Sequence, residues 1–160
     1  MKPPARYDPV EKEDTDMNTI LEQRPDPAAF GRELGPGLGI NLLVADVEAS
    51  IAFQTGALDI ELVWRESDFA VLRACGSTWM IHADRAYRDH PLGRAVAGLD
   101  VRGAGAELRL YGCDPDRAAS RAEVAGGSVL CPPLDKAHGL REAFLIDPDG
   151  YVWAPCKALP

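Results

Sequence analysis

The stretch NLLVADVEASIAF, residues 41–53, has the pattern of a strand that leads directly into a helix. The large aliphatic residues at its start, together with Ile40, favour a half-buried strand. Asp46 is a preferred helix N-cap, because its carboxylate can accept hydrogen bonds from the free backbone amides of the first turn. The stretch therefore predicts a strand over 40–44 and a helix from Asp46 to about Gly56.

The same order of elements is predicted a second time further along the chain. Residues 107–111 form the predicted strand, Asp114 and Pro115 begin the predicted helix, and two glycines at 126 and 127 end it. Short apolar segments follow each helix, near 59–64, 68–74 and 77–82 in the first copy and near 128–131, 141–146 and 151–154 in the second. Both copies read βαβββ, so we expect an α+β fold in which the two repeats form a curved mixed sheet around a cleft, with the helices on its convex side.

The rest of the chain surrounds and connects the repeats. Residues 1–16 combine prolines with a dense mixture of charges, which predicts a disordered acidic tail. Residues 17–35 predict an N-terminal extension with one short helix, capped by Asp26, and a single module then spans residues 36–160. Between the repeats, residues 85–106 predict a linker or a loop at the edge of the cleft.

Composition excludes several classes of function. The formal net charge of -8 opposes binding to nucleic acid, which needs clustered lysines and arginines. No apolar run approaches the roughly 20 residues of a membrane-spanning helix, and the N-terminus has no apolar core typical of a secretion signal. The four cysteines form no CxxC pair and are predicted to be reduced thiols. We therefore expect a cytoplasmic protein without a nucleic-acid or membrane partner.

The candidate site is predicted from the alternation of side chains along the strands. In the opening strand of the second repeat, Leu108 and Leu110 share one face, while Glu107, Arg109 and Tyr111 share the other. One helix per repeat covers the apolar face, which leaves the polar face as the candidate site. The alternative is that Glu107 and Arg109 form an ion pair on a solvated strand surface.

Two histidines are weighed in the same way. His82 shares a strand face with Thr78 and Met80, and a hydrogen-bonded structural role is as plausible as ligand contact. His138 lies in a predicted loop, where it could reach a ligand or remain in solvent. The complete predicted ligand-binding set is Asn41, Thr78, Met80, His82, Glu107, Arg109, Tyr111 and His138.

The sequence resembles the glyoxalase / bleomycin-resistance / extradiol-dioxygenase superfamily, also called vicinal oxygen chelate. The segments that carry the resemblance are residues 41–53, residues 114–116, and residues 139–153 with their DPDG turn. Together they frame about 120 residues. The resemblance implies that residues 36–160 form one module of this type.

The resemblance also implies where a metal would bind. Metal-using members hold histidine, glutamate or glutamine at four strand positions, which correspond here to Gly39, Met80, Glu107 and Ala154. Only Glu107 is a suitable ligand, and one carboxylate does not hold a divalent ion. We therefore expect a cleft without metal or another cofactor. A different metal site, built from His82, Glu107 and His138, is the alternative.

The resemblance implies small-molecule binding for ligand sequestration or resistance. A cleft with both signs of charge, from Glu107 and Arg109, favours a polar or zwitterionic ligand. Trp64, Tyr111 and the two other tryptophans, Trp79 and Trp153, are possible stacking walls, although strand alternation places Trp79 and Trp153 on the helix-covered side. The alternative is a lyase or isomerase of the glyoxalase type, with or without metal, in which Glu107 or His82 acts as general base. The resemblance also implies a homodimer.

Overall fold

The computed structural model describes residues 26–160, so the predicted tail over residues 1–16 lies outside the described residues. The chain divides into two compact units, residues 1–37 and Leu38–Pro160. The candidate site belongs to the second unit, which contains both repeats.

The described part of the first unit contains the predicted short helix. Helix α2 spans Pro27–Glu33, and the Asp26 carboxylate accepts hydrogen bonds from two backbone amides of its first turn. Proline suits this first turn because it has no amide hydrogen to leave unpaired. None of the helices in residues 26–160 has the length and apolar character needed to cross a membrane.

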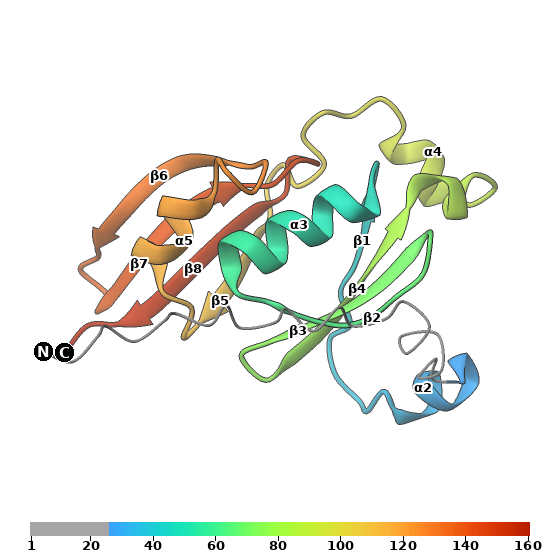
Figure 1. Cartoon of the computed structure of the whole chain (residues 1–160), viewed down its shortest axis with the longest axis horizontal. Helices are drawn as coiled ribbons and strands as arrows, with labels where there is room; N and C mark the ends of the chain where they lie inside the picture. Colours follow the sequence, from blue (N-terminus) through green and yellow to red (C-terminus); the bar gives the residue numbers. More distant parts are fainter. Residues whose placement is uncertain (1–25) are drawn as a thin grey trace, which may run out of the picture. The chain divides into compact units, whose positions relative to one another are not determined.

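The second unit contains the two predicted βαβββ repeats (Figure 1). The first consists of β1 (Asn41–Val44), α3 (Val47–Leu58), β2 (Glu61–Arg65), β3 (Phe69–Ala74) and β4 (Ser77–Ala83). The second consists of β5 (Glu107–Tyr111), α5 (Pro115–Arg121), β6 (Ser128–Asp135), β7 (Leu140–Ile146) and β8 (Val152–Ala158). The predicted α+β class and the repeat are confirmed.

The strands form two four-stranded sheets with the orders β1-β4-β3-β2 and β5-β8-β7-β6. In each sheet the first strand of the repeat pairs in parallel with the last, and the other pairs are antiparallel. The sequence predicted that the two repeats together form a curved mixed sheet. Within residues 26–160 each repeat forms its own four-stranded mixed sheet, with β1 and β5 as edge strands.

The helix-covered faces of the two sheets meet in one hydrophobic core. Helices α3 and α5 lie side by side (Figure 1). The rings of Trp79 on β4 and Trp153 on β8 lie 5.7 Å apart, centroid to centroid, as part of this core. Because both helix-covered faces contribute to one core, the opposite face of each sheet is directed away from it. We call these the first outer face, with Asn41, Phe69, Thr78, Met80 and His82, and the second outer face, with Glu107, Arg109, Tyr111, Glu142 and Phe144.

The first long helix ends two residues beyond the predicted bound of about Gly56. Helix α3 continues to Leu58 and stops at Asp59, which adopts the left-handed conformation with φ 54°. A Cβ atom at Gly56 would lie 3.4 Å from the Cβ of Ala125, in the turn that follows α5. The glycine therefore allows close packing of the two repeats instead of terminating the helix.

The predicted linker between the repeats contains two short helices, η1 (Asp84–Tyr87) and α4 (Pro91–Val96). His90 caps α4, since its Nδ1 accepts a hydrogen bond of 3.1 Å from the Leu92 amide. Pro91 lies in the first turn of α4, where proline is compatible with a helix. His90 therefore has a structural role.

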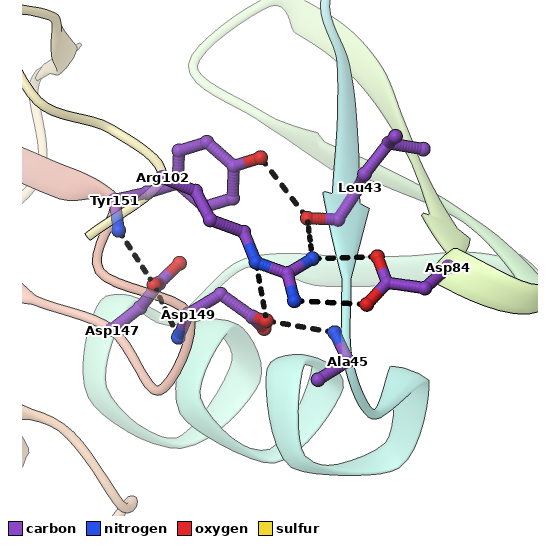
Figure 2. A network of polar contacts seen from close by, with 7 residues as sticks. All are labelled: Leu43, Ala45, Asp84, Arg102, Asp147, Asp149 and Tyr151. Carbon is purple, nitrogen blue, oxygen red and sulfur yellow. Dashed lines mark hydrogen bonds and ion pairs between the residues drawn. The ribbon is translucent and has the colours of Figure 1, made fainter. Parts of the chain in front are cut away.

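A buried arginine in the linker ties the two repeats together (Figure 2). Arg102 donates hydrogen bonds of 2.6 and 2.9 Å to the two carboxylate oxygens of Asp84. It also donates to the Leu43 carbonyl at 3.1 Å, and its Nε lies 3.5 Å from Asp149 Oδ1. Asp149 accepts a further bond of 2.7 Å from the Ala45 amide. One side chain thus connects β1 and η1 of the first half to the β7–β8 turn of the second.

The DPDG turn itself is shaped by Asp147. Its Oδ1 accepts hydrogen bonds from the amides of Asp149 and Tyr151, and its Oδ2 accepts one from Trp153 Nε1. Burial raises the pKa of both Asp147 and Asp149 despite these bonds. The side chain that braces this turn is Arg102, whereas Arg141 pairs with Asp116 and Glu142 pairs with Arg109.

Candidate functional site

Three side chains form a hydrogen-bonded chain on the first outer face. Asn41 Nδ2 donates to the hydroxyl of Tyr87 at 2.7 Å, and Asn41 Oδ1 lies 2.6 Å from His82 Nδ1. An amide oxygen can only accept, so His82 Nδ1 carries the hydrogen in this arrangement. The Nε2 atom of His82 then keeps its lone pair.

Aromatic rings surround this histidine. The Phe69 ring lies 4.6 Å from the His82 ring, and the Tyr87 ring lies 5.3 Å from it, centroid to centroid. Burial lowers the pKa of His82, because an imidazolium would lose hydration there. His82 is therefore held neutral, with one defined tautomer.

The second outer face carries a charged cluster instead. Glu142 on β7 has a side chain only 4% exposed, and Arg109 from β5 forms a hydrogen-bonded ion pair with it. His138 Nε2 lies 3.5 Å and Lys136 Nζ 3.9 Å from its two carboxylate oxygens. Arg109 also donates to Glu107 at 2.9 Å. Two cationic groups, Arg109 and Lys136, and the imidazole of His138 thus converge on one buried carboxylate.

The electrostatics of this cluster favour its charged form. Burial opposes ionisation of Glu142, yet the hydrogen bond and the charge of Arg109 outweigh it and lower the pKa of the carboxyl. Burial likewise opposes the charge on Arg109, but its bonds to Glu142 and Glu107 raise the pKa of the guanidinium. Arg109 also lies 5.9 Å from the centre of the Tyr111 ring, a cation–π distance.

A pocket of about 170 Å³ lies along the edge strand β5. Its lining residues are Ile40, Cys75, Ser77, Trp79, Glu107, Leu108, Arg109, Leu110, Tyr111 and Trp153. Trp79 Nε1 donates to Gln54 at 2.9 Å and Trp153 Nε1 donates to Asp147 at 3.0 Å, so both indole N–H groups are bound within the protein. The two rings therefore offer carbon surface to the pocket, while Glu107 and Arg109 bring charges of opposite sign to it.

The structure divides the predicted ligand-binding set into two groups. Asn41, Thr78, Met80 and His82 lie on the first outer face, and Glu107, Arg109 and Tyr111 lie on the second, with His138 in the adjoining β6–β7 turn. No hydrogen bond, ion pair or ring contact in the described residues joins the first four residues to the other four. The arrangement of all eight around a single cleft stays a prediction.

Glu142 and Lys136 were missed by sequence reasoning. The available signal for Glu142 was its alternation with Leu140 and Phe144, which places one carboxylate in the middle of an otherwise apolar strand face. No comparable signal exists for Lys136, which lies in a turn among other polar residues.

The residues at the family-derived metal positions do not fit a divalent ion. Gly39 precedes β1 and has no donor, and Ala154 lies beside Arg109 in the sheet without a donor of its own. Across residues 26–160, no cluster of three or more His, Cys, Asp or Glu side chains is arranged to hold a metal. The alternative site from His82, Glu107 and His138 is therefore wrong, because His82 belongs to the other sheet.

Comparisons with known proteins show which family this chain belongs to. The family model for the Glyoxalase/Bleomycin resistance protein/Dioxygenase superfamily matches residues 39–154. No curated protein matches the chain. A glyoxalase-related enzyme from Fulvimarina pelagi is 22% identical over 78% of this chain and 88% of its own, with a TM-score of 0.62.

Two further solved structures show the same fold. A glyoxalase/bleomycin resistance protein/dioxygenase family enzyme from Burkholderia phytofirmans PsJN is 20% identical over 76% of this chain and 97% of its own, with a TM-score of 0.61. TioX from Micromonospora sp. ML1 is 20% identical over 78% of this chain and 100% of its own, with a TM-score of 0.56. At these identities the structures support the fold alone. The family model covers most of the chain, so this protein belongs to the glyoxalase/bleomycin resistance protein/dioxygenase superfamily.

Proposed function

We propose that this protein binds a small molecule with an apolar body and a zwitterionic or otherwise polar end in the pocket along β5. The observation that carries the proposal is the composition of that pocket. Trp79 and Trp153 supply apolar ring surface, and Glu107 and Arg109 supply both signs of charge. Pockets of this kind bind ligands through apolar contact and use a few polar groups to select and orient them.

The charge arrangement favours a zwitterion over a simple anion or cation. Arg109 is already paired with Glu142 and Glu107, so the pocket has no unpaired cation that would attract an anion by itself. A ligand with both charges can exchange partners with Arg109 and Glu107 and leave neither charge without a counterion. Such binding suits ligand sequestration or resistance, in which a compound is held without being changed.

Three probes with the same apolar body test this assignment: L-phenylalanine, phenylacetate and phenethylamine. Binding is measured by thermal shift and by quenching of Trp79 and Trp153 fluorescence in a Trp64→Phe background. We expect L-phenylalanine to bind best, and a ligand at 100 times its Kd adds about 2.7 kcal/mol to the free energy of unfolding.

Matched variants identify the site. Arg109→Ala should abolish the preference for L-phenylalanine, whereas Arg141→Ala, which loses only ion pairs to Asp116 and Asp135, should preserve it. The proposal fails if the three probes give equal responses, if none binds, or if the preference survives in Arg109→Ala.

A second candidate function is that of a metal-independent lyase or isomerase with His82 as general base. The observation that favours it is the neutral imidazole with Nδ1 bonded to Asn41 and a lone pair on Nε2. Deuterium incorporation next to the carbonyl of dihydroxyacetone, followed by proton NMR in D2O, tests this activity. It should require His82 and be lost in His82→Gln, and exchange no faster than in buffer would contradict it.

We also propose that the protein is a cytoplasmic homodimer. Tyr111, 62% exposed, and Leu134, 47% exposed, leave apolar surface on the second sheet that a second copy could cover. The four cysteines are free thiols, which suits a reducing compartment. Light scattering should give twice the chain mass, and Tyr111→Glu should shift it to the monomer; a monomeric wild type would contradict the proposal.

A further inference from the structure

A second, larger pocket lies where the two repeats meet. Its volume is about 430 Å³, and Cys75 and Cys113 both line it. Cys75 belongs to the turn between β3 and β4 of the first repeat, and Cys113 follows β5 of the second. Two thiols from separate repeats thus border one cavity.

The backbone at Cys75 is unfavourable for its residue type. Cys75 and Gly76 form the two-residue turn of the β3–β4 hairpin and have φ values of 51° and 76°. Such turns favour asparagine or glycine, because other side chains are strained at positive φ. Folding alone therefore does not explain a cysteine here, and a strained residue at a cavity is a reason to consider function.

The strained turn directs the Cys75 thiol toward the second repeat. A Cβ atom placed on Gly112 would lie 4.0 Å from Cys75 Sγ, and Gly112 directly precedes Cys113. Cys75 is exposed, so small reagents can reach it. It also lines the smaller pocket along β5.

Cys113 has a different environment. Its Sγ lies 3.5 Å from the Leu58 carbonyl, and it is partly buried. Burial raises the pKa of the Cys113 thiol to about 11, and the charge of Cys75 adds to this effect. Cys113 is therefore unlike a thiol that reacts first with an external reagent. The exposed Cys75 has that role, and Cys113 is placed to react with it afterwards.

We propose that Cys75 and Cys113 form a reversible disulfide that links the two repeats, with a low-molecular-weight disulfide as oxidant. The Cys75 thiolate attacks one sulfur of oxidised glutathione, forms a mixed disulfide and releases one glutathione thiolate. Cys113 then loses its proton to solvent, attacks the Cys75 sulfur and expels the second glutathione thiolate. The two protein thiols lose two electrons, and one oxidised glutathione is reduced to two thiols.

We expect the disulfide to join two lining residues of the larger pocket, Cys75 and Cys113. It should also change the lining of the smaller pocket, to which Cys75 contributes. The inference is independent of the proposed ligand binding, because its primary readout is the covalent bond. The loop between the two cysteines is long enough that the cross-link should raise Tm by roughly 10 °C.

Titration of the full chain with mixtures of reduced and oxidised glutathione tests the proposal. Mass spectrometry should show loss of two of the four free thiols, a mass lower by about two hydrogens, and a cross-linked peptide pair containing positions 75 and 113. Reduction with dithiothreitol should restore all four thiols and the original Tm.

Three variants separate this bond from other outcomes. Cys75→Asn suits the hairpin turn and should fold at least as stably as the reduced protein, yet form no cross-link. Cys113→Ser keeps a donor to the Leu58 carbonyl and should stop at the mixed disulfide on Cys75. Cys131→Ser should behave like the wild type. The proposal is overturned by a cross-link through Cys131 or Cys156, by a mixed disulfide in the wild type that never resolves, or by retention of all four thiols.

Discussion

The two outer faces have the same strand topology and opposite chemistry. The first outer face centres on a neutral histidine held by Asn41 and surrounded by aromatic rings. The second centres on a buried, ionised Glu142 that attracts Arg109, Lys136 and His138. The βαβββ repeat thus determines where such groups can be placed but not which chemistry they provide.

The difference also affects how each face could take part in binding. On the first outer face, the lone pair of His82 accepts a proton or a hydrogen bond without any change in charge pairing. On the second, any polar ligand must compete with an existing ion pair. Four predictions test this comparison, from the largest expected effect to the smallest.

Arg102 connects the two repeats that carry the outer faces. Its removal should therefore lower the free energy of unfolding more than the other substitutions do. Arg102→Ala leaves Asp149, with a side chain 4% exposed, without its buried counterion. We expect the free energy of unfolding to fall by about 3–5 kcal/mol, measured by urea denaturation. Arg65→Ala is the control, since its ion pair with Glu48 is exposed and should contribute at most about 1 kcal/mol. A loss as small as that of the control would mean that the halves do not depend on this network.

Glu142→Gln tests whether the second outer face depends on a buried charge. The substitution leaves Arg109 with only the exposed Glu107 as ion-pair partner. We expect the free energy of unfolding to fall by about 2–3 kcal/mol. The fall is limited because the Arg109 side chain is 25% exposed and water can solvate its charge. Glu107→Gln should cost less than about 1 kcal/mol in the same urea titration. Equal losses in the two variants would show that Glu142 does not organise the cluster.

Asn41→Ala tests the hydrogen-bonded chain of Tyr87, Asn41 and neutral His82 on the first outer face. The variant removes the partners of His82 Nδ1 and of the Tyr87 hydroxyl, at an expected cost of about 1–2 kcal/mol. Nitrogen NMR of the imidazole should change from one tautomer to a mixture. Thr78→Ala, at an exposed position of the same face, should alter stability by less than about 0.5 kcal/mol and leave the tautomer unchanged.

The two faces should also differ in how the free energy of unfolding depends on pH. This change in stability should be the smallest of the four. The pKa of His82 is lowered in the folded state, so the unfolded chain binds a proton first, and stability falls as the pH drops below the ordinary value of 6.5. The pKa of Glu142 is also lowered, so its contribution is lost only in more acidic solution, below its ordinary value of 4.5. Urea titrations across pH should show a smaller first decline in His82→Gln and a smaller second decline in Glu142→Gln, since Asp68, Asp114 and Asp116 also have lowered pKa values and contribute to the acid range. An unchanged profile in either variant would refute the corresponding assignment.

Strand faces were predictable from the sequence, and the contacts within each face were not. Alternation along β5 placed Leu108 and Leu110 in the core and Arg109 on the outer face, as the structure shows. The partner of Arg109 is 33 positions away on β7, and no pattern near either residue indicates it. The close approach of Gly56 to Ala125 was not predictable for a similar reason, because Ala125 belongs to the other repeat.

The sequence by itself determined the α+β class, the two βαβββ repeats and the capped helices, because alternation and N-capping depend on residues only a few positions apart. Tertiary structure decided that the strands form two sheets, that the predicted site residues separate onto two surfaces, and that Arg102 unites the halves. These features depend on contacts between distant parts of the chain, such as the 59 positions between Leu43 and Arg102. Burial keeps His82 neutral, whereas pairing with each other keeps Glu142 and Arg109 ionised against the effect of burial.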